Sequence, residues 1–203
     1  SSPASSRAGN RYGMFGMAIA VITTLVTHEI ASLPEIVGAI AIGGGVGFVI
    51  ARKIQMTAMP QLVAAFHSLV GLAAVLVGLA AYLNPHAFGI LLPSGAINPD
   101  SRVEMGLGIA IGAITFSGSV IAFLKLNGNM SGSAILLPAR HAINLGTLLA
   151  ILCLVAWFTR DESLWVIAVI TALSFIIGFL LIIPIGGADM PVVVSMLNSY
   201  SGW

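Results

Sequence analysis

The chain has 203 residues, of which 58% are hydrophobic and only 7% are charged, and its formal net charge is +1. Charged residues make up about a quarter of a typical soluble domain, so this composition excludes a soluble globular protein and indicates a membrane protein. The low net charge, with no basic cluster larger than the pair Arg52 and Lys53, also argues against a nucleic-acid partner.

The start of the given sequence is polar. A Ser/Pro/Ala run over residues 1–6 is followed by Arg7 and Arg11. It lacks the basic start, apolar middle and small-residue cleavage site of a signal peptide. The chain also begins without methionine, so we expect it to start inside a longer protein.

Apolar stretches separated by Pro, Gly and Asn predict an all-α fold, a polytopic membrane helix bundle. A helix needs roughly 20 apolar residues to cross a bilayer. The first, second and fifth stretches are short, and would need a thin bilayer or flanking arginines that reach the headgroups. Six transmembrane helices are predicted, over residues 12–27, 36–51, 61–83, 105–124, 142–158 and 164–183.

The charges are distributed unevenly between the two sides of this bundle. If the N-terminus is cytoplasmic, six of the eight Lys and Arg residues are cytoplasmic and six of the seven acids lie on the far side. Lys and Arg are enriched in short cytoplasmic loops of membrane proteins. The sequence therefore predicts a cytoplasmic N-terminus, provided that all six helices cross the membrane.

His67 is the only histidine, acid or basic residue inside the six predicted helices. An ionisable group at membrane depth typically marks an ion or proton path, and imidazole titrates near neutral pH. Helical spacing places His67 on a face of small residues, with Ala64 and Gly71 beside it, while Leu69 and Leu76 fall on the opposite, lipid-type face. His67 is thus a candidate proton carrier facing the bundle interior. A histidine that only hydrogen-bonds a neighbouring helix remains the alternative.

Polar side chains on other predicted helices are candidates for a proton path to His67. They are found in the fourth, fifth and sixth predicted helices, in helical register with glycines or other hydroxyls. Each of them singly is also typical of hydrogen bonds between helices, which contribute about 0.6 kcal/mol. The candidates are Thr115, Ser119, Asn144 and Ser174.

Other chemistry has little support in the sequence. No second metal ligand shares the helix face of His67, and haem ligation by His67 with His141 lacks a second histidine inside a helix. No nucleophile and base constellation is visible. The single cysteine, Cys153, cannot form an internal disulfide, and we expect a packed thiol.

Two long motifs resemble those of the proton-translocating NAD(P) transhydrogenases. The segment MPQLVAAFHSLVGLAA, residues 59–74, is similar to the histidine-bearing helix of that family. The segment GGADMPVVVSMLNSYSGW, residues 186–203, resembles the most recognisable motif of the β subunit. The shorter motifs TFSGS (115–119) and LPARH (137–141) also fit, and the resemblance extends over the whole chain.

The resemblance implies that residues 1–203 are a transmembrane, proton-translocating domain, with a partial seventh helix from about residue 192. The enzyme, Re/Si-specific, couples hydride transfer from NADH to NADP⁺ with inward proton movement. His67 would match the proton-channel histidine and Asn198 a channel-associated asparagine. Asp189 would lie near the face that contacts the NADP(H)-binding domain and act in coupling.

The resemblance also implies the cofactors and partners. No cofactor would bind to these residues. NADP(H) would bind on a domain absent from this sequence, and NAD(H) on an α-type subunit or segment. The enzyme would be a homodimeric assembly in the lipid bilayer of the bacterial cytoplasmic (inner) membrane. The rival interpretation is a non-enzymatic polytopic proton channel or secondary transporter that uses His67.

Overall fold

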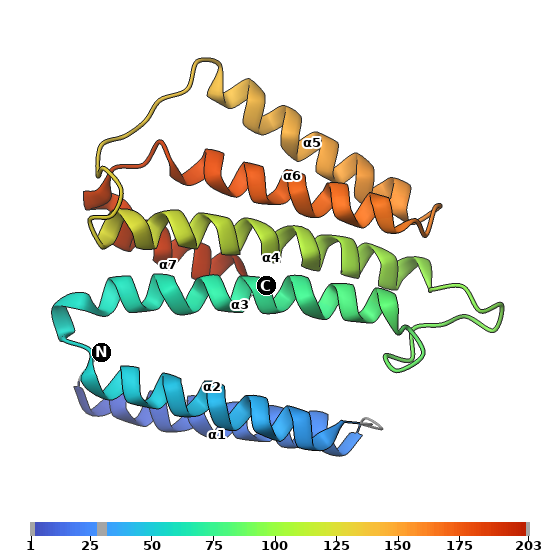
Figure 1. The fold of residues 1–203 in the computed structure, drawn as a ribbon, viewed down its shortest axis with the longest axis horizontal. Coiled ribbons are helices and arrows are strands. Elements are labelled where there is room, and N and C mark those ends of the chain that lie inside the picture. Colours follow the sequence, from blue (N-terminus) through green and yellow to red (C-terminus); the bar gives the residue numbers. More distant parts are fainter. Residues whose placement is uncertain (1–2, 28–31, 202–203) are drawn as a thin grey trace. The chain divides into compact units, whose positions relative to one another are not determined.

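The computed structural model describes residues 3–27 and 32–201 and is all-α in these ranges (Figure 1). The expected fold class is therefore confirmed. Leu91 and Ile97 form an isolated β-bridge in the loop between α3 and α4. Within the described ranges, seven helices and two short 3-10 turns follow one another in the order α1 (Pro3–Thr27), α2 (Leu33–Lys53), η1 (Met56–Ala58), α3 (Met59–Leu83), α4 (Pro99–Leu126), α5 (Arg140–Phe158), α6 (Leu164–Ile182), η2 (Gly187–Asp189) and α7 (Met190–Ser201).

Five of the described helical segments, rather than the expected six, are long and apolar enough to cross a membrane: α2, η1 with α3, α4, α5 and α6. The helix expected over residues 12–27 does form, but as the second part of the longer α1. Its first turns contain Arg7, Asn10 and Arg11, and the apolar part that follows is shorter than the roughly 20 residues that a bilayer requires. α7 begins at Met190, slightly before the expected start of the seventh helix at about residue 192.

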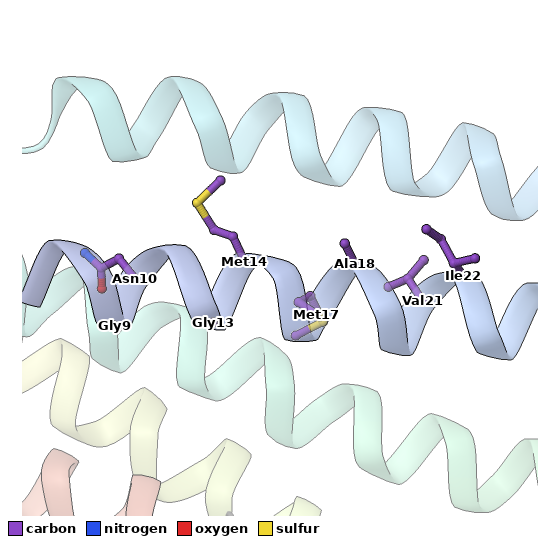
Figure 2. Close-up of a pocket in the computed structure, with 8 residues that line it drawn as sticks. All are labelled: Gly9, Asn10, Gly13, Met14, Met17, Ala18, Val21 and Ile22. Atoms are coloured by element: carbon purple, nitrogen blue, oxygen red, sulfur yellow. The ribbon is translucent and has the colours of Figure 1, made fainter.

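The chain divides into two compact units, Ser1–Lys53 and Ile54–Trp203. In the first unit, the described side chains of α1 and α2 are almost all exposed. A hollow of about 900 Å³ is lined by eight residues that all belong to α1, as Figure 2 shows, so it is the side surface of one helix. Gly43 and Gly47 of α2 have the spacing of small residues at helix contacts in membranes, but a Cβ atom added at either glycine would meet no atom of α1 within 4 Å.

In the second unit α4 is the central helix. Figure 1 shows α4 (green) between α3 and α6, with α5 beyond α6, and α7 packs against α4 and α3. Three glycines of α4 permit these close approaches. Gly106 faces Val155 of α5, Gly112 faces the backbone of Gly71 in α3, and Gly118 faces Ile182 of α6 and a side chain of α7. Small residues allow helices to pack tightly where lipid offers no hydrophobic driving force between them.

At one end of this unit, a buried arginine near the start of α4, Arg102, forms hydrogen bonds to several segments. The Arg102 guanidinium donates to the carbonyl oxygens of Ile97 (2.8 Å) and Thr159 (3.0 Å), and it also pairs with the carboxylate of Glu162. Glu162 in turn accepts the amide of Ile97 at 3.0 Å, and its backbone carbonyl accepts the hydroxyl of Tyr82 at 2.6 Å. The network connects α3, the α3–α4 loop, α4 and the α5–α6 loop.

Candidate functional site

His67 lies in the first half of α3 and is only 5% exposed. Ala64, Ser68 and Gly71 on the same side of α3 are buried as well, whereas Leu69 and Leu76 are exposed. The expectation that His67 faces the bundle and that these leucines do not is confirmed. Gly71 determines how close the next helix comes, because a Cβ atom there would lie 2.5 Å from the Phe116 nitrogen.

The register of α3 and α4 places His67 level with Ser119. Near one end, the side-chain amide of Gln61 donates to the carbonyl of Leu126 at 3.3 Å. Farther along, Gly71 is opposite Phe116. Between these two points the antiparallel helices bring His67 close to the height of Ser119, a fully buried residue.

A second contact connects His67 to α7. The imidazole shares a hydrogen bond with the backbone of Leu197. Asn198 follows directly on α7 and is exposed in the described chain. The histidine is therefore enclosed by three helices: α3 carries it, α4 faces it and α7 supplies a backbone partner.

Two hydroxyl groups among the candidate path residues are buried without a hydrogen-bond partner in the described part of the chain. They belong to Ser119 and Ser174, and both residues are 0% exposed. Buried polar atoms are nearly always hydrogen-bonded, so each orphan identifies a place where a further donor or acceptor is expected. In contrast, the buried hydroxyl of Ser117 donates to the carbonyl of Ala113 at 2.9 Å.

Thr115 and Asn144 have different surroundings. Thr115 is buried and lines a hollow of about 440 Å³ between α4, α6 and α7, which Leu197 also lines. Asn144 is half-buried on α5, a helix that packs against α6 and α4. The structure thus places Ser119 near the height of His67 and Thr115 beside α7, but Asn144 lies on a helix that packs against α6 and α4.

Asp189 lies where α6 gives way to α7. It is the last residue of η2, is exposed, and its amide donates to the Gly186 carbonyl at 3.1 Å. Met190, the first residue of α7, is in contrast fully buried. Asp189 therefore lies on the turn between α6 and α7, next to Gly186 and Gly187 and shortly before Pro191.

Lys125, which is not among the candidate residues predicted from the sequence, is a buried residue of this region. It is 5% exposed, and its ammonium donates to the carbonyls of Ile183 (2.6 Å), Ile185 (2.7 Å) and Ser133 (3.3 Å). These acceptors flank the turn that leads to Asp189. The signal in the sequence was the continuation of the apolar helix pattern up to Lys125.

The remaining expectations concern metal binding and Cys153. The described residues contain no group of three or more His, Cys, Asp or Glu side chains that could hold a metal ion. Cys153 is exposed on α5, so the interpretation as a packed thiol is wrong. It lies on a side of α5 that does not face α4 or α6, where the neighbours Leu152 and Trp157 are exposed too.

Comparison with known proteins agrees with the motifs. The family model described as "NAD(P) transhydrogenase beta subunit" matches residues 1–203. Two curated sequences from Rhodospirillum rubrum, both named NAD(P) transhydrogenase subunit beta, are 60% identical to the chain over 203 residues. The match covers 100% of this chain but only 44% of those relatives, so the chain spans less than half of their length. With its whole length matched and its helices suited to crossing a membrane, this multi-pass chain belongs to the NAD(P) transhydrogenase beta subunit family.

Proposed function

We propose that the chain is the proton-conducting membrane part of an NAD(P) transhydrogenase, in which His67 accepts and releases the translocated proton. The observation that carries the proposal is the enclosure of His67, 5% exposed, between α3, α4 and α7. An imidazole held at membrane depth among small residues can bind a proton and be reached by a chain of hydroxyls or water. Ser119 lies at the same height, and its hydroxyl has no partner among the described residues.

The reaction of the complete enzyme would be hydride transfer from NADH to NADP⁺, Re/Si-specific and coupled to inward proton movement. These residues would bind neither nucleotide. NADP(H) would bind on a further domain of the same subunit and NAD(H) on an α-type subunit, in a homodimeric assembly. Asp189 is exposed at the α6–α7 turn, where a docked domain could reach it. A change in the nucleotide state of that domain would then be transmitted from Asp189 along α7 to Asn198 and His67.

The membrane would be the bacterial inner membrane. The N-terminus of this chain would be cytoplasmic on the premise that α1, although its apolar part is short, also crosses the bilayer, with Arg7 and Arg11 reaching the headgroups. The end of the second unit that contains Lys125, Arg140 and Asp189 would then be cytoplasmic, since α4 ends there and α5 and α7 begin there (Figure 1). The opposite end, with Arg102 and Glu162, would face the other compartment. Lys and Arg near the first end agree with the charge bias of cytoplasmic loops.

The test uses the complete enzyme reconstituted in proteoliposomes, with His67→Asn as the variant. Asparagine keeps a polar, hydrogen-bonding side chain but cannot carry a proton at neutral pH. We expect proton translocation to be lost and the coupled hydride transfer to slow at least ten-fold (~1.4 kcal/mol in the barrier). His86→Asn, at a loop position outside the helices, should behave as the parent enzyme. Near-normal pumping by a folded His67→Asn enzyme would overturn the proposal.

A further inference from the structure

The buried ammonium of Lys125 has all of its donors in use. An ammonium group has three N–H donors, and Lys125 directs hydrogen bonds to three backbone carbonyls, those of Ser133, Ile183 and Ile185. No donor remains for a carboxylate or a phosphate. The Lys125 ammonium is therefore not available to form an ion pair with Asp189 or to bind a nucleotide.

The three carbonyls belong to two segments that Lys125 holds together. Ile183 and Ile185 lie at the end of α6 and in the following turn, while Ser133 lies in the α4–α5 loop. A positive charge at the C-terminal end of α6 also interacts favourably with the helix dipole. A buried charge is costly unless fully hydrogen-bonded, so this arrangement depends on all three carbonyls staying in place.

A second set of contacts joins the same two segments, the α4–α5 loop and the α6–α7 turn, and we call this contact region the junction. The amide of Gly187 donates to the carbonyl of Gly132 at 2.8 Å, and the amide of Ile135 donates to that of Ile183 at 3.4 Å. The two glycines are in close contact, since a Cβ on Gly187 would lie 3.3 Å from the Gly132 Cα. The α4–α5 loop is thus packed directly against η2, the turn that ends at Asp189.

The junction determines where α7 starts. α7 follows η2 without a break at Met190, whose side chain is fully buried in an apolar cluster with Ala64 and Ala122. α7 packs against α3 and α4, and two turns after Met190 the backbone of Leu197 lies beside the His67 imidazole. A shift of the turn would therefore move the backbone partner of His67.

We infer that Lys125 is a positioning residue of proton translocation: it fixes the α6–α7 turn on α4 and thereby holds α7 in place against His67. The inference rests on the proposed function, because it gives the position of α7 a role in proton transfer. Lys125 itself touches no transferred proton and no nucleotide.

The experiment compares Lys125→Met with Lys53→Met in the complete enzyme, reconstituted in proteoliposomes. Lys53 is the other lysine of the chain and is exposed at the end of α2. The principal readout is the number of protons translocated per hydride transferred, which a loss of folded protein alone would not change. We expect this ratio to fall at least two-fold in Lys125→Met and to stay unchanged in Lys53→Met. Lys125→Arg, which keeps a charged donor, should retain more of the ratio than Lys125→Met.

A second readout does not depend on pumping. Amide hydrogen exchange at Gly187 and Ile135 should rise at least ten-fold in Lys125→Met, while the Ile97 amide at the opposite end of the bundle serves as internal reference. If Lys125→Met does not fold, Gly187→Val tests the same junction by placing a side chain against Gly132, with Gly146→Val, which has open space around it, as control. The ratio should then fall for Gly187→Val alone.

The outcomes separate this inference from the proposed function. An unchanged ratio and unchanged exchange in Lys125→Met, while His67→Asn abolishes pumping, would overturn the inference alone. A reduced thermal stability with an unchanged ratio would also overturn it, because Lys125 would then only support the fold. Normal pumping by His67→Asn would overturn the proposed function, whereas exchange at Gly187 would still report whether Lys125 holds the turn.

Discussion

Gly71 and Gly112 each occupy the space that a side chain on the other would need. A Cβ atom on Gly71 would lie 2.7 Å from the carbonyl oxygen of Gly112, and one on Gly112 would lie 2.8 Å from the carbonyl oxygen of Gly71. The backbones of α3 and α4 are thus in direct contact at this crossing. Because the crossing lies one turn from His67, it determines how α4 presents Ser119 to the histidine.

The first prediction concerns this crossing. Gly71→Ala should destabilise the bundle by about 1–3 kcal/mol, because the added methyl must push the α4 backbone away, and it should reduce pumping. Gly108→Ala is the matched control on α4, where a Cβ meets nothing within 4 Å and the better helix propensity of alanine is gained. Thermal unfolding in detergent and pumping in proteoliposomes measure the two effects. Equal thermal stability and equal pumping in both variants would show that α3 and α4 can move apart at this crossing without loss.

The second prediction distinguishes a proton-path hydroxyl from a structural one. Ser119→Ala removes a buried hydroxyl that has no partner among the described residues, so it should leave stability unchanged or raise it slightly. It should nevertheless lower pumping several-fold if that hydroxyl serves His67. Ser117→Ala is the control, since the Ser117 hydroxyl is buried but already bonded to the Ala113 carbonyl. Pumping that is equal in Ser119→Ala and the parent enzyme would remove Ser119 from the path.

The third prediction concerns the arginine network at the start of α4. Arg102→Met should cost about 2–3 kcal/mol of stability, less than the loss typical of a fully buried pair because Glu162 is partly exposed. Glu162→Gln should cost less, since an amide oxygen can still accept from the Ile97 amide, which now bonds the carboxylate. Arg160→Met, at an exposed position in the adjacent loop, should have little effect. Thermal unfolding of the three variants checks this order, and the reverse order would contradict it.

The fourth prediction concerns Asp189. If a docked NADP(H) domain acts on the α6–α7 turn, Asp189→Asn should change the affinity or the release rate of NADP(H) at least two-fold, without contact between Asp189 and the nucleotide. Asp100→Asn, exposed at the opposite end of α4, should change neither. Nucleotide binding to the complete enzyme measures the effect. Unchanged binding together with unchanged pumping would leave Asp189 as an ordinary loop charge.

The parts of the site that follow from helical periodicity could be predicted from the sequence. The small residues Ala64 and Gly71 repeat on the His67 side of α3, and bulky leucines repeat on the other side. In a membrane bundle such a pattern has one low-energy orientation, with small residues toward neighbouring helices. The burial of His67 and the exposure of Leu69 and Leu76 follow from it.

Contacts made to the backbone could not be predicted in the same way. Lys125 and Arg102 bond carbonyls of segments distant in the chain, and no residue pattern indicates which carbonyl a long side chain will reach. Asn144 shares the polarity of the other candidates, but its helix packs on the side of the bundle away from α3. Polarity and period locate a side chain on its own helix, whereas the neighbours of that helix depend on the fold.

The three acceptors of Lys125 are main-chain carbonyls, and this has a consequence for the evolution of the junction. Every residue type supplies the same carbonyl oxygen, so the side chains at Ser133, Ile183 and Ile185 do not encode these hydrogen bonds. Substitutions at these three positions can accumulate without loss of the contact, provided that the backbone keeps its course. A search for covarying residue pairs would therefore find no partner for Lys125, although this side chain connects two segments of the protein.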